Sequence, residues 1–134
     1  MGALTTDRNT PLKDGEIIPV PVAAGVKIFG GALVAANATG FATPGAVATT
    51  LTYLGRAEGL ADNTAGANGA ISVPVRRKKA FKFANHGADL VVQADLGKTC
   101  YIVDDQTVAK TNGGSTRSAA GKVLGVESDG VWVE

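Results

Sequence analysis

Short apolar runs separated by glycine, asparagine and aspartate dominate the pattern of this chain. In one of them, Ile71, Val73 and Val75 alternate with Ser72 and Pro74, which is the two-residue period of a strand with one buried face. Similar runs lie at residues 26–29, 32–36, 51–54, 71–75, 81–83, 99–103, 122–126 and 131–133. Closely spaced short strands with turn residues between them predict an all-β fold, either a sandwich or a barrel.

Glycine and proline leave little room for helices. The chain holds 18 Gly and 5 Pro, and the longest stretch free of both is residues 98–112. That stretch is rich in Thr, Val, Ile and Tyr, which favour strands over helices. We therefore expect no long helix.

Two hairpins are predicted in the second half of the chain. Asp129-Gly130 lies between the apolar residues around Val126 and the run 131–133, and Asp-Gly in such a setting is a strong signal for a tight turn. The last strand should pack through Trp132, or through Val131 and Val133. Residues 104–106 separate the runs 101–103 and 107–109 and predict the other hairpin.

The N-terminal region differs from the rest. Residues 1–15 are polar and irregular, and the following segment carries Pro19 and Pro21 on one side of an extended chain. Because proline has no N–H to donate, this segment should be an edge strand or an extended arm rather than a central strand. We predict an extended arm over residues 1–22 and a single β-rich domain over residues 23–134.

A weak internal similarity relates residues 31–58 to residues 97–127. Each part has a short strand, a turn and a closing Leu-Gly motif that ends in Glu58 or Glu127. Gly31 and Gly97 are 66 positions apart, whereas Leu54 and Leu124 are 70 apart, so the second part would need four extra residues, which 113–116 could hold. Short glycine-rich strands also resemble one another by chance, so both explanations stay open.

Composition limits the function classes. Thirteen basic and 12 acidic residues give a net charge of +1, which argues against a general nucleic-acid coat. Cys100 is the only cysteine, so no intramolecular disulfide is possible. No apolar run approaches the roughly 20 residues of a spanning helix, and residues 1–10 contain no apolar secretion signal. We expect a soluble, cytoplasmically made product.

The usual chemical motifs are incomplete. Gly97-Lys98-Thr99 has no glycine five positions earlier and precedes a predicted strand, so it is interpreted as a turn and not a phosphate loop. Cys100 and the single His86 could pair as nucleophile and base, but Cys100 lies in a predicted strand and no third residue is placed to orient His86. We predict no catalytic residues, no metal site and no cofactor.

One concentrated charge stands out. Arg76, Arg77, Lys78 and Lys79, followed by Lys82, place five cations within seven positions. The cluster interrupts an alternating pattern, so a kink, bulge or short turn is expected there. It is either a solvated strand end or a site that docks to an acidic protein surface.

Several landmark segments follow one another over residues 15–134, at 29–34, 40–44, 54–58, 67–73, 94–98, 104–108, 121–126 and 129–133. The order of these landmarks resembles the capsid cement (head decoration) proteins of tailed bacteriophages. Residues 1–15 and the Arg76–Lys79 cluster match no pattern of that family.

The resemblance implies a small β-rich protein with jelly-roll-like sheets that binds the outside of an assembled phage head as a symmetric dimer or trimer. Its partners would be the major capsid protein and itself, with no membrane and no direct nucleic acid contact, and it would be located on the outer surface of the virion capsid. Candidate capsid or subunit contacts are the extended segment and the basic residues: Ile17, Ile18, Pro19, Val20, Pro21, Arg76, Arg77, Lys78, Lys79 and Lys82.

Three rivals remain. The first is another non-enzymatic virion module, associated with a tail or fibre, although the chain has no repeated glycine-rich shaft segments. The second is a small hydrolase that uses Cys100 and His86. The third is a nucleic-acid binder, which should show salt-dependent binding to DNA.

Overall fold

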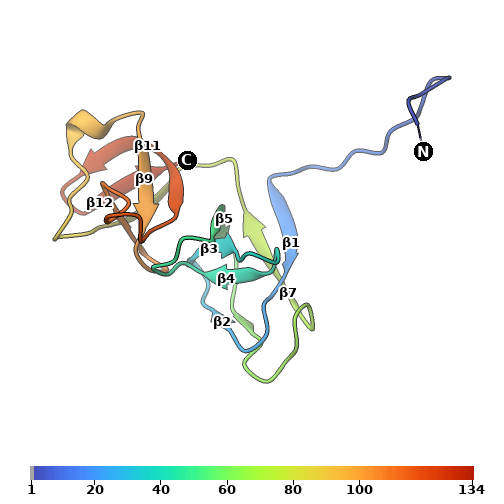
Figure 1. Cartoon of the computed structure of the whole chain (residues 1–134), viewed down its shortest axis with the longest axis horizontal. Coiled ribbons are helices and arrows are strands. Elements are labelled where there is room, and N and C mark those ends of the chain that lie inside the picture. Colours follow the sequence, from blue (N-terminus) through green and yellow to red (C-terminus); the bar gives the residue numbers. More distant parts are fainter. Residues whose placement is uncertain (1) are drawn as a thin grey trace.

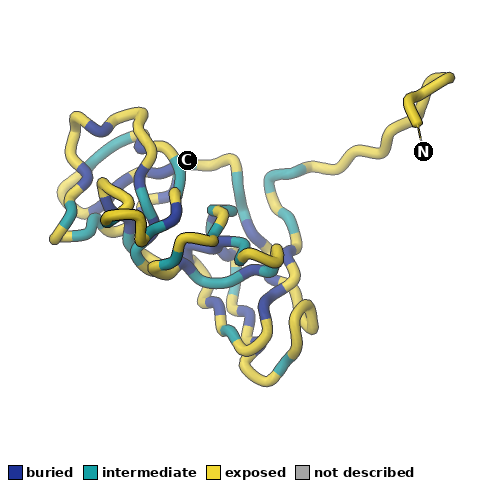
Figure 2. The backbone as a smooth tube through the Cα atoms, viewed as in Figure 1, coloured by how far each residue is buried: buried dark blue, intermediate teal, exposed yellow. Residues whose placement is uncertain are grey.

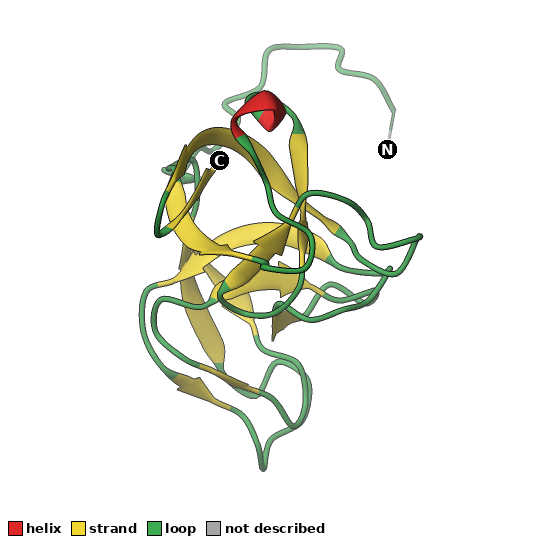
Figure 3. Ribbon diagram, turned by 90° about the vertical axis from the view of Figure 1, so that its left-hand side faces the viewer, coloured by secondary structure: helices red, strands yellow, loops and turns green. Residues whose placement is uncertain are grey.

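The computed structural model describes residues 2–134, and its regular secondary structure consists almost entirely of short strands joined by turns and loops (Figures 1 and 3). The N-terminal unit, residues 17–76, contains β1 (Ile17–Pro21), β2 (Lys27–Ile28), β3 (Leu33–Ala36), β4 (Ala42–Pro44), β5 (Thr52–Ala57), β6 (Ala61–Asp62) and β7 (Ser72–Arg76). The C-terminal unit, residues 81–134, contains β8 (Phe81–Asn85), the 3-10 turn η1 (Gln93–Asp95), β9 (Thr99–Ile102), β10 (Thr107–Ala109), β11 (Ala119–Glu127) and β12 (Gly130–Val133). The all-β prediction is confirmed.

The C-terminal unit is a closed barrel with the strand order β10-β8-β12-β11-β9. All its neighbouring strands are antiparallel except β8 and β10, which close it through the parallel pairs Ala84–Thr107 and Asn85–Val108. Both predicted hairpins are present here, β9–β10 and β11–β12. Val131 and Val133 face the core and Trp132 faces outward, which settles the two options for the last strand.

The N-terminal unit is a five-stranded sheet with the order β1-β7-β5-β3-β4, and β2 and β6 form a separate small ladder. β1 is an edge strand, as the prolines predicted. Pro19 lies directly opposite Pro74 on β7. Just after β1, Val22 forms a parallel bridge with Ala42 of β4, so the two edges of the sheet meet at one point.

The two units repeat the same strand order and register. β1, β7, β5, β3 and β4 correspond in turn to β8, β12, β11, β9 and β10. The pairs Leu33–Arg56 and Thr99–Lys122 match, each residue shifted by 66 positions, and so do the pairs Ala36–Ala42 and Ile102–Val108. Even the parallel closures, Val22–Ala42 and Asn85–Val108, correspond.

Equivalent glycines mark the repeat. Gly31 and Gly97 have φ angles of 86° and 80°, and their N–H groups donate to the carbonyls of Ala57 and Val123, each at 2.8 Å. A constant shift of 66 positions relates the paired residues of β3, β4 and β5 to those of β9, β10 and β11. The second part of the repeat therefore needs no four-residue insertion. Leu54 corresponds to Ala120, so the proposed match with Leu124 was wrong.

Two hydrophobic cores fill the units, and β3 belongs to both. Val34 packs into the N-terminal core with Val20, Val22, Ile28, Ala42, Ala57, Val73 and Val75. Leu33 and Ala35, on the opposite face of β3, pack into the C-terminal core with Phe81, Phe83, Val91, Cys100, Ile102, Val108, Val123, Val131 and Val133. The alternation of a single strand thus joins the two units.

The segment outside the units is shorter than the predicted arm of residues 1–22. Residues 17–21 form β1, and Val20 and Val22 are buried. Residues 2–14 are exposed and extend away from the body (Figures 1 and 2), while Met1 lies outside the described residues. We call residues 2–16 the N-terminal arm from here on.

Candidate interaction surfaces

The basic cluster lies at the connection between the two units, where β7 ends and β8 begins. The chain turns at residues 77–80, and Lys78 has a φ of 62°, so the turn predicted at this cluster is confirmed. The connection is therefore fixed by a residue in a left-handed backbone conformation, which is uncommon for a side chain of this size.

Three of the five cations, Arg76, Lys79 and Lys82, are paired with acids. Glu58 accepts hydrogen bonds from Arg56 (2.7 Å) and Arg76 (2.9 Å), and these bonds hold the pKa of its carboxyl below the usual value. Lys79 lies 3.2 Å from Glu16. The cluster is therefore partly neutralised within the chain, which weakens its local positive field.

Lys82 belongs to a separate surface group on the C-terminal unit. Its ammonium lies 2.8 Å from Asp129 and 5.7 Å from the centre of the Trp132 ring. The Lys82–Asp129 hydrogen bond raises the pKa of Lys82 and lowers that of Asp129. Trp132 also donates its ring N–H to Glu127.

Arg77 and Lys78 are the cluster residues that form no ion pair with another residue of the described chain. Both side chains approach Gly15, where the N-terminal arm meets the body. A docking role for the cluster therefore depends on these two side chains.

The candidate contacts on β1 divide into two sets. Ile18 and Val20 face the N-terminal core, whereas Ile17, Pro19 and Pro21 face solvent. One side of β1 is fully paired with β7, and on the open side the two prolines offer no N–H. A further strand could not form a regular ladder along residues 17–21.

Residues 2–14 of the N-terminal arm are exposed and belong to neither hydrophobic core of the described chain. The side chains of Leu4 and Leu12 are 72% and 94% exposed. The hydrogen bonds of residues 2–14 are local, from the N–H of Thr10 to the carbonyl of Arg8 and from the N–H of Glu16 to Asp14, whereas the Glu16 carbonyl accepts from the Arg77 N–H (2.8 Å). This segment is available for contact with another molecule.

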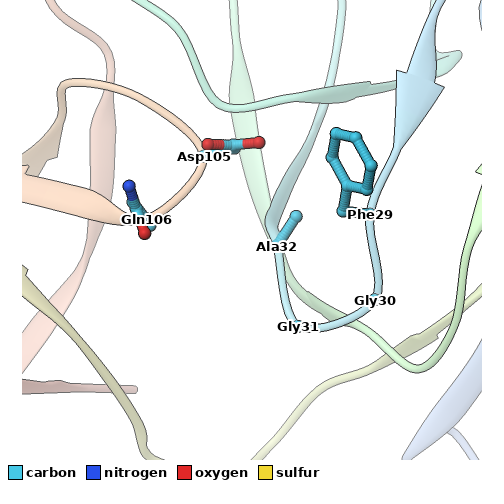
Figure 4. Close-up of a pocket in the computed structure, with 6 residues that line it drawn as sticks. All are labelled: Phe29, Gly30, Gly31, Ala32, Asp105 and Gln106. Carbon is cyan, nitrogen blue, oxygen red and sulfur yellow. The ribbon is translucent and has the colours of Figure 1, made fainter.

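A pocket of about 390 Å³ lies where the two units meet, and sequence reasoning missed it. Phe29, Gly30, Gly31 and Ala32 come from the turn before β3, and Asp105 and Gln106 come from the β9–β10 hairpin. The Leu33 N–H donates to the Asp105 carbonyl (2.8 Å) and ties these segments together. In Figure 4 the Phe29 ring and the Asp105 carboxylate stand on either side of Ala32.

Cys100 is placed in the core rather than at a surface. It is almost fully buried, its thiol contacts the Gly121 carbonyl at 3.4 Å, and burial raises its pKa to about 11. Because the thiolate is the reactive form, this environment makes Cys100 a poor nucleophile. Burial also raises the pKa of the neighbouring Tyr53, whose buried hydroxyl has no hydrogen-bond partner among residues 2–134.

Neither metal-site geometry nor a spanning helix is found in residues 2–134. No group of three or more His, Cys, Asp or Glu side chains there is arranged to hold a metal ion. No helix in the same residues has the length and apolar character needed to cross a membrane.

Comparison with known proteins gave no match, whether to a protein-family model, to a curated protein or to a solved structure.

Proposed function

We propose that this protein is a bacteriophage capsid cement protein, which binds the outer surface of the assembled head and stabilises it by bridging capsomers. The observation that carries the proposal is the ordered series of strand and turn motifs over residues 15–134 that resembles this family. Its partners would be the major capsid protein and further copies of itself, and its location the outside of the virion.

The arrangement of surfaces supports a bridging role. Two similar units are joined through a shared strand, and the N-terminal arm extends from one of them (Figure 1). A protein that holds neighbouring capsomers together needs separate contact surfaces at fixed positions. Many copies on one shell then turn weak individual contacts into strong binding.

The environment of Cys100 supports a non-enzymatic role. The candidate nucleophile is buried and its pKa is about 11, so the small-hydrolase alternative has no reactive thiol at neutral pH.

Co-sedimentation with heads tests the proposal. Purified protein is mixed with undecorated heads of the parent phage, both unexpanded and expanded, over a salt series. Saturable binding to the outside of heads is expected, and the number of bound copies distinguishes dimers at two-fold axes from trimers at three-fold axes. Failure to bind either form of head would overturn the proposal and favour a tail or fibre module.

Charge reversal tests the basic cluster separately. The double variant Arg77→Glu/Lys78→Glu leaves the Arg76–Glu58 and Lys79–Glu16 pairs intact. Binding to heads should weaken, and its dependence on salt should become shallower, because two charges that attract an acidic surface are lost. Lys98→Glu/Lys110→Glu, at two exposed positions outside the cluster, is the matched control. Equal binding by both double variants would show that the cluster is a solvated strand end.

A further inference from the structure

The N-terminal arm and the pocket between the units are two unpartnered features with matching chemistry. In the arm, Leu12 is almost fully exposed, and Arg8 and Lys13 form no ion pair with any residue of the described chain. The arm therefore offers two exposed leucines, Leu4 and Leu12, and two cations without an ion pair in the described chain, each next to an aspartate in the sequence.

The pocket offers the complementary groups. Its wall includes the Phe29 ring, which is 57% exposed. Leu60, 62% exposed, is not part of the pocket lining but precedes Ala61, which pairs with Ile28 next to Phe29. Across the pocket, the partly buried Asp105 carboxylate has no hydrogen bond or ion pair within residues 2–134. An exposed apolar wall opposite a free carboxylate suits a segment that carries both a leucine and a cation.

A cation near this wall, Lys27, forms no ion pair with Asp105 among the described residues. Lys27 lies over the Phe29 ring at 5.2 Å. It is paired in register with Asp62, and its charge contributes to the lowered pKa of that carboxyl. The negative charge at Asp105 is left for a group from outside the pocket.

The geometry of the arm favours a second molecule as the source of that group. Leu12 lies five positions before the start of β1, so even a fully extended chain carries it only roughly 17 Å from that strand. The arm starts from β1, whose ladder to β7 fixes its direction, and it points away from the body (Figure 1).

We infer that the N-terminal arm of one copy binds the pocket between the units of a second copy, with Leu12 against Phe29 and the cations Arg8 and Lys13 toward Asp105. Each chain carries both the arm and this pocket, so reciprocal exchange closes a dimer and cyclic exchange closes a trimer. The inference specifies the self-association that the proposed function includes. It is tested without capsids, so its failure is distinguishable from failure to bind heads.

Sedimentation velocity of the full chain over a concentration series tests the inference. The wild-type protein should self-associate, and Leu12→Ser, Asp105→Lys and Arg8→Glu/Lys13→Glu should each weaken the association at least tenfold. Combining Asp105→Lys with Arg8→Glu/Lys13→Glu should restore it, because the charges are exchanged between arm and pocket. Circular dichroism checks that each variant is folded.

Matched controls change the same charges elsewhere. Glu134→Lys and Lys98→Glu/Lys110→Glu alter exposed residues outside the arm and the pocket lining and should leave the association unchanged. A wild-type protein that stays monomeric over the concentration series would overturn the inference. So would association that survives the arm and pocket substitutions, or a charge exchange that does not restore association.

Discussion

At the scale of single residues, two equivalent glycines, one in each unit, allow neighbouring backbone segments of that unit to approach closely. A Cβ on Gly55 would lie 2.1 Å from the carbonyl oxygen of Arg76, and one on Gly121 would lie 2.1 Å from the carbonyl oxygen of Glu134. Gly55 also has a φ of 149°, which other residues rarely adopt. Both glycines lie where one strand passes a neighbouring backbone too closely for any side chain.

Alanine at either position should therefore destabilise the protein. For Gly55→Ala and Gly121→Ala we expect a loss of about 1–3 kcal/mol in the free energy of unfolding, comparable to other overpacked sites. Chemical denaturation measures the loss. Gly87→Ala is the control, because a Cβ there meets no atom within 4 Å, and equal stability of all three variants would contradict the prediction.

An aspartate links two loops of the C-terminal unit. Asp89 accepts hydrogen bonds from the N–H and hydroxyl of Thr111 and from Arg117, which lies at 2.8 Å. These bonds lower the pKa of Asp89, and the hydrogen bond from the Thr111 hydroxyl has the largest effect. The ionised carboxylate is thus favoured in the folded state.

Asp89→Asn should lower the melting temperature at neutral pH but not in strong acid. A lowered pKa in the folded state means that the stabilisation is complete above the pKa of the unfolded chain and disappears as the pH falls through the pKa of the folded protein. Thermal melts from pH 7 to pH 2 should show the two proteins converging. Asp7→Asn, in the exposed arm, should match the wild type throughout, and a constant gap for Asp89→Asn would count against the linkage.

At the scale of elements, β1 is the boundary between the body and the N-terminal arm. Its outward prolines prevent further strand addition, and its inward Val20, with Val22 beyond it, completes the N-terminal core. The extended sequence 17–22 is thus part of the fold, whereas residues 2–14 contribute nothing to either core.

Two truncations separate these roles. Removal of residues 2–14 should leave the melting temperature of dilute protein within about 2 °C of the wild type, because surface changes away from buried groups alter stability little. Removal of residues 2–22 should abolish cooperative folding, since it exposes one side of β7 and takes two valines from the core. A cooperative melt of the longer truncation at the wild-type temperature would show that β1 is dispensable.

Local sequence patterns predicted the strands and hairpins well, because each depends on neighbouring residues. The alternation at 71–75 became β7, and the Asp129-Gly130 turn joins β11 to β12. The short strands β4 and β6 were missed, since three and two residues cannot show a period. The pocket was also missed, because it forms only when the turn before β3 meets the β9–β10 hairpin.

The full extent of the repeat was hidden for a different reason. Between residues 31–58 and 97–124, only Gly31, Thr50 and Gly55 are identical to their equivalents, Gly97, Thr116 and Gly121. Core positions keep their apolar character but not their size, as when Val20 corresponds to Phe83 and Val34 to Cys100. The equivalence is shown by the pairing register of the strands, which depends on the three-dimensional structure and is not visible in the sequence.

At the scale of the whole molecule, the two units are bound into one cooperative structure. The alternate faces of β3 place Val34 in one core and Leu33 in the other, so neither core is complete without this strand. The hydroxyl of Ser118 also accepts from the Leu51 N–H (3.0 Å) and donates to the Ala48 carbonyl (2.7 Å), which links the C-terminal unit to the loop before β5. A substitution that destabilises one unit should therefore also destabilise the other.

The single tryptophan, Trp132, reports on the C-terminal unit and makes this testable. Val34→Ala leaves a cavity in the N-terminal core only and should cost about 1–3 kcal/mol. If the units unfold together, the Trp132 fluorescence transition shifts to lower denaturant by the same amount as the circular dichroism transition of the whole chain. An unchanged Trp132 transition beside a shifted circular dichroism signal would mean that the units unfold independently. Because β3 carries both cores, opening its pairing to β5 removes Leu33 and Val34 from their neighbours at once, and we expect the two transitions to coincide.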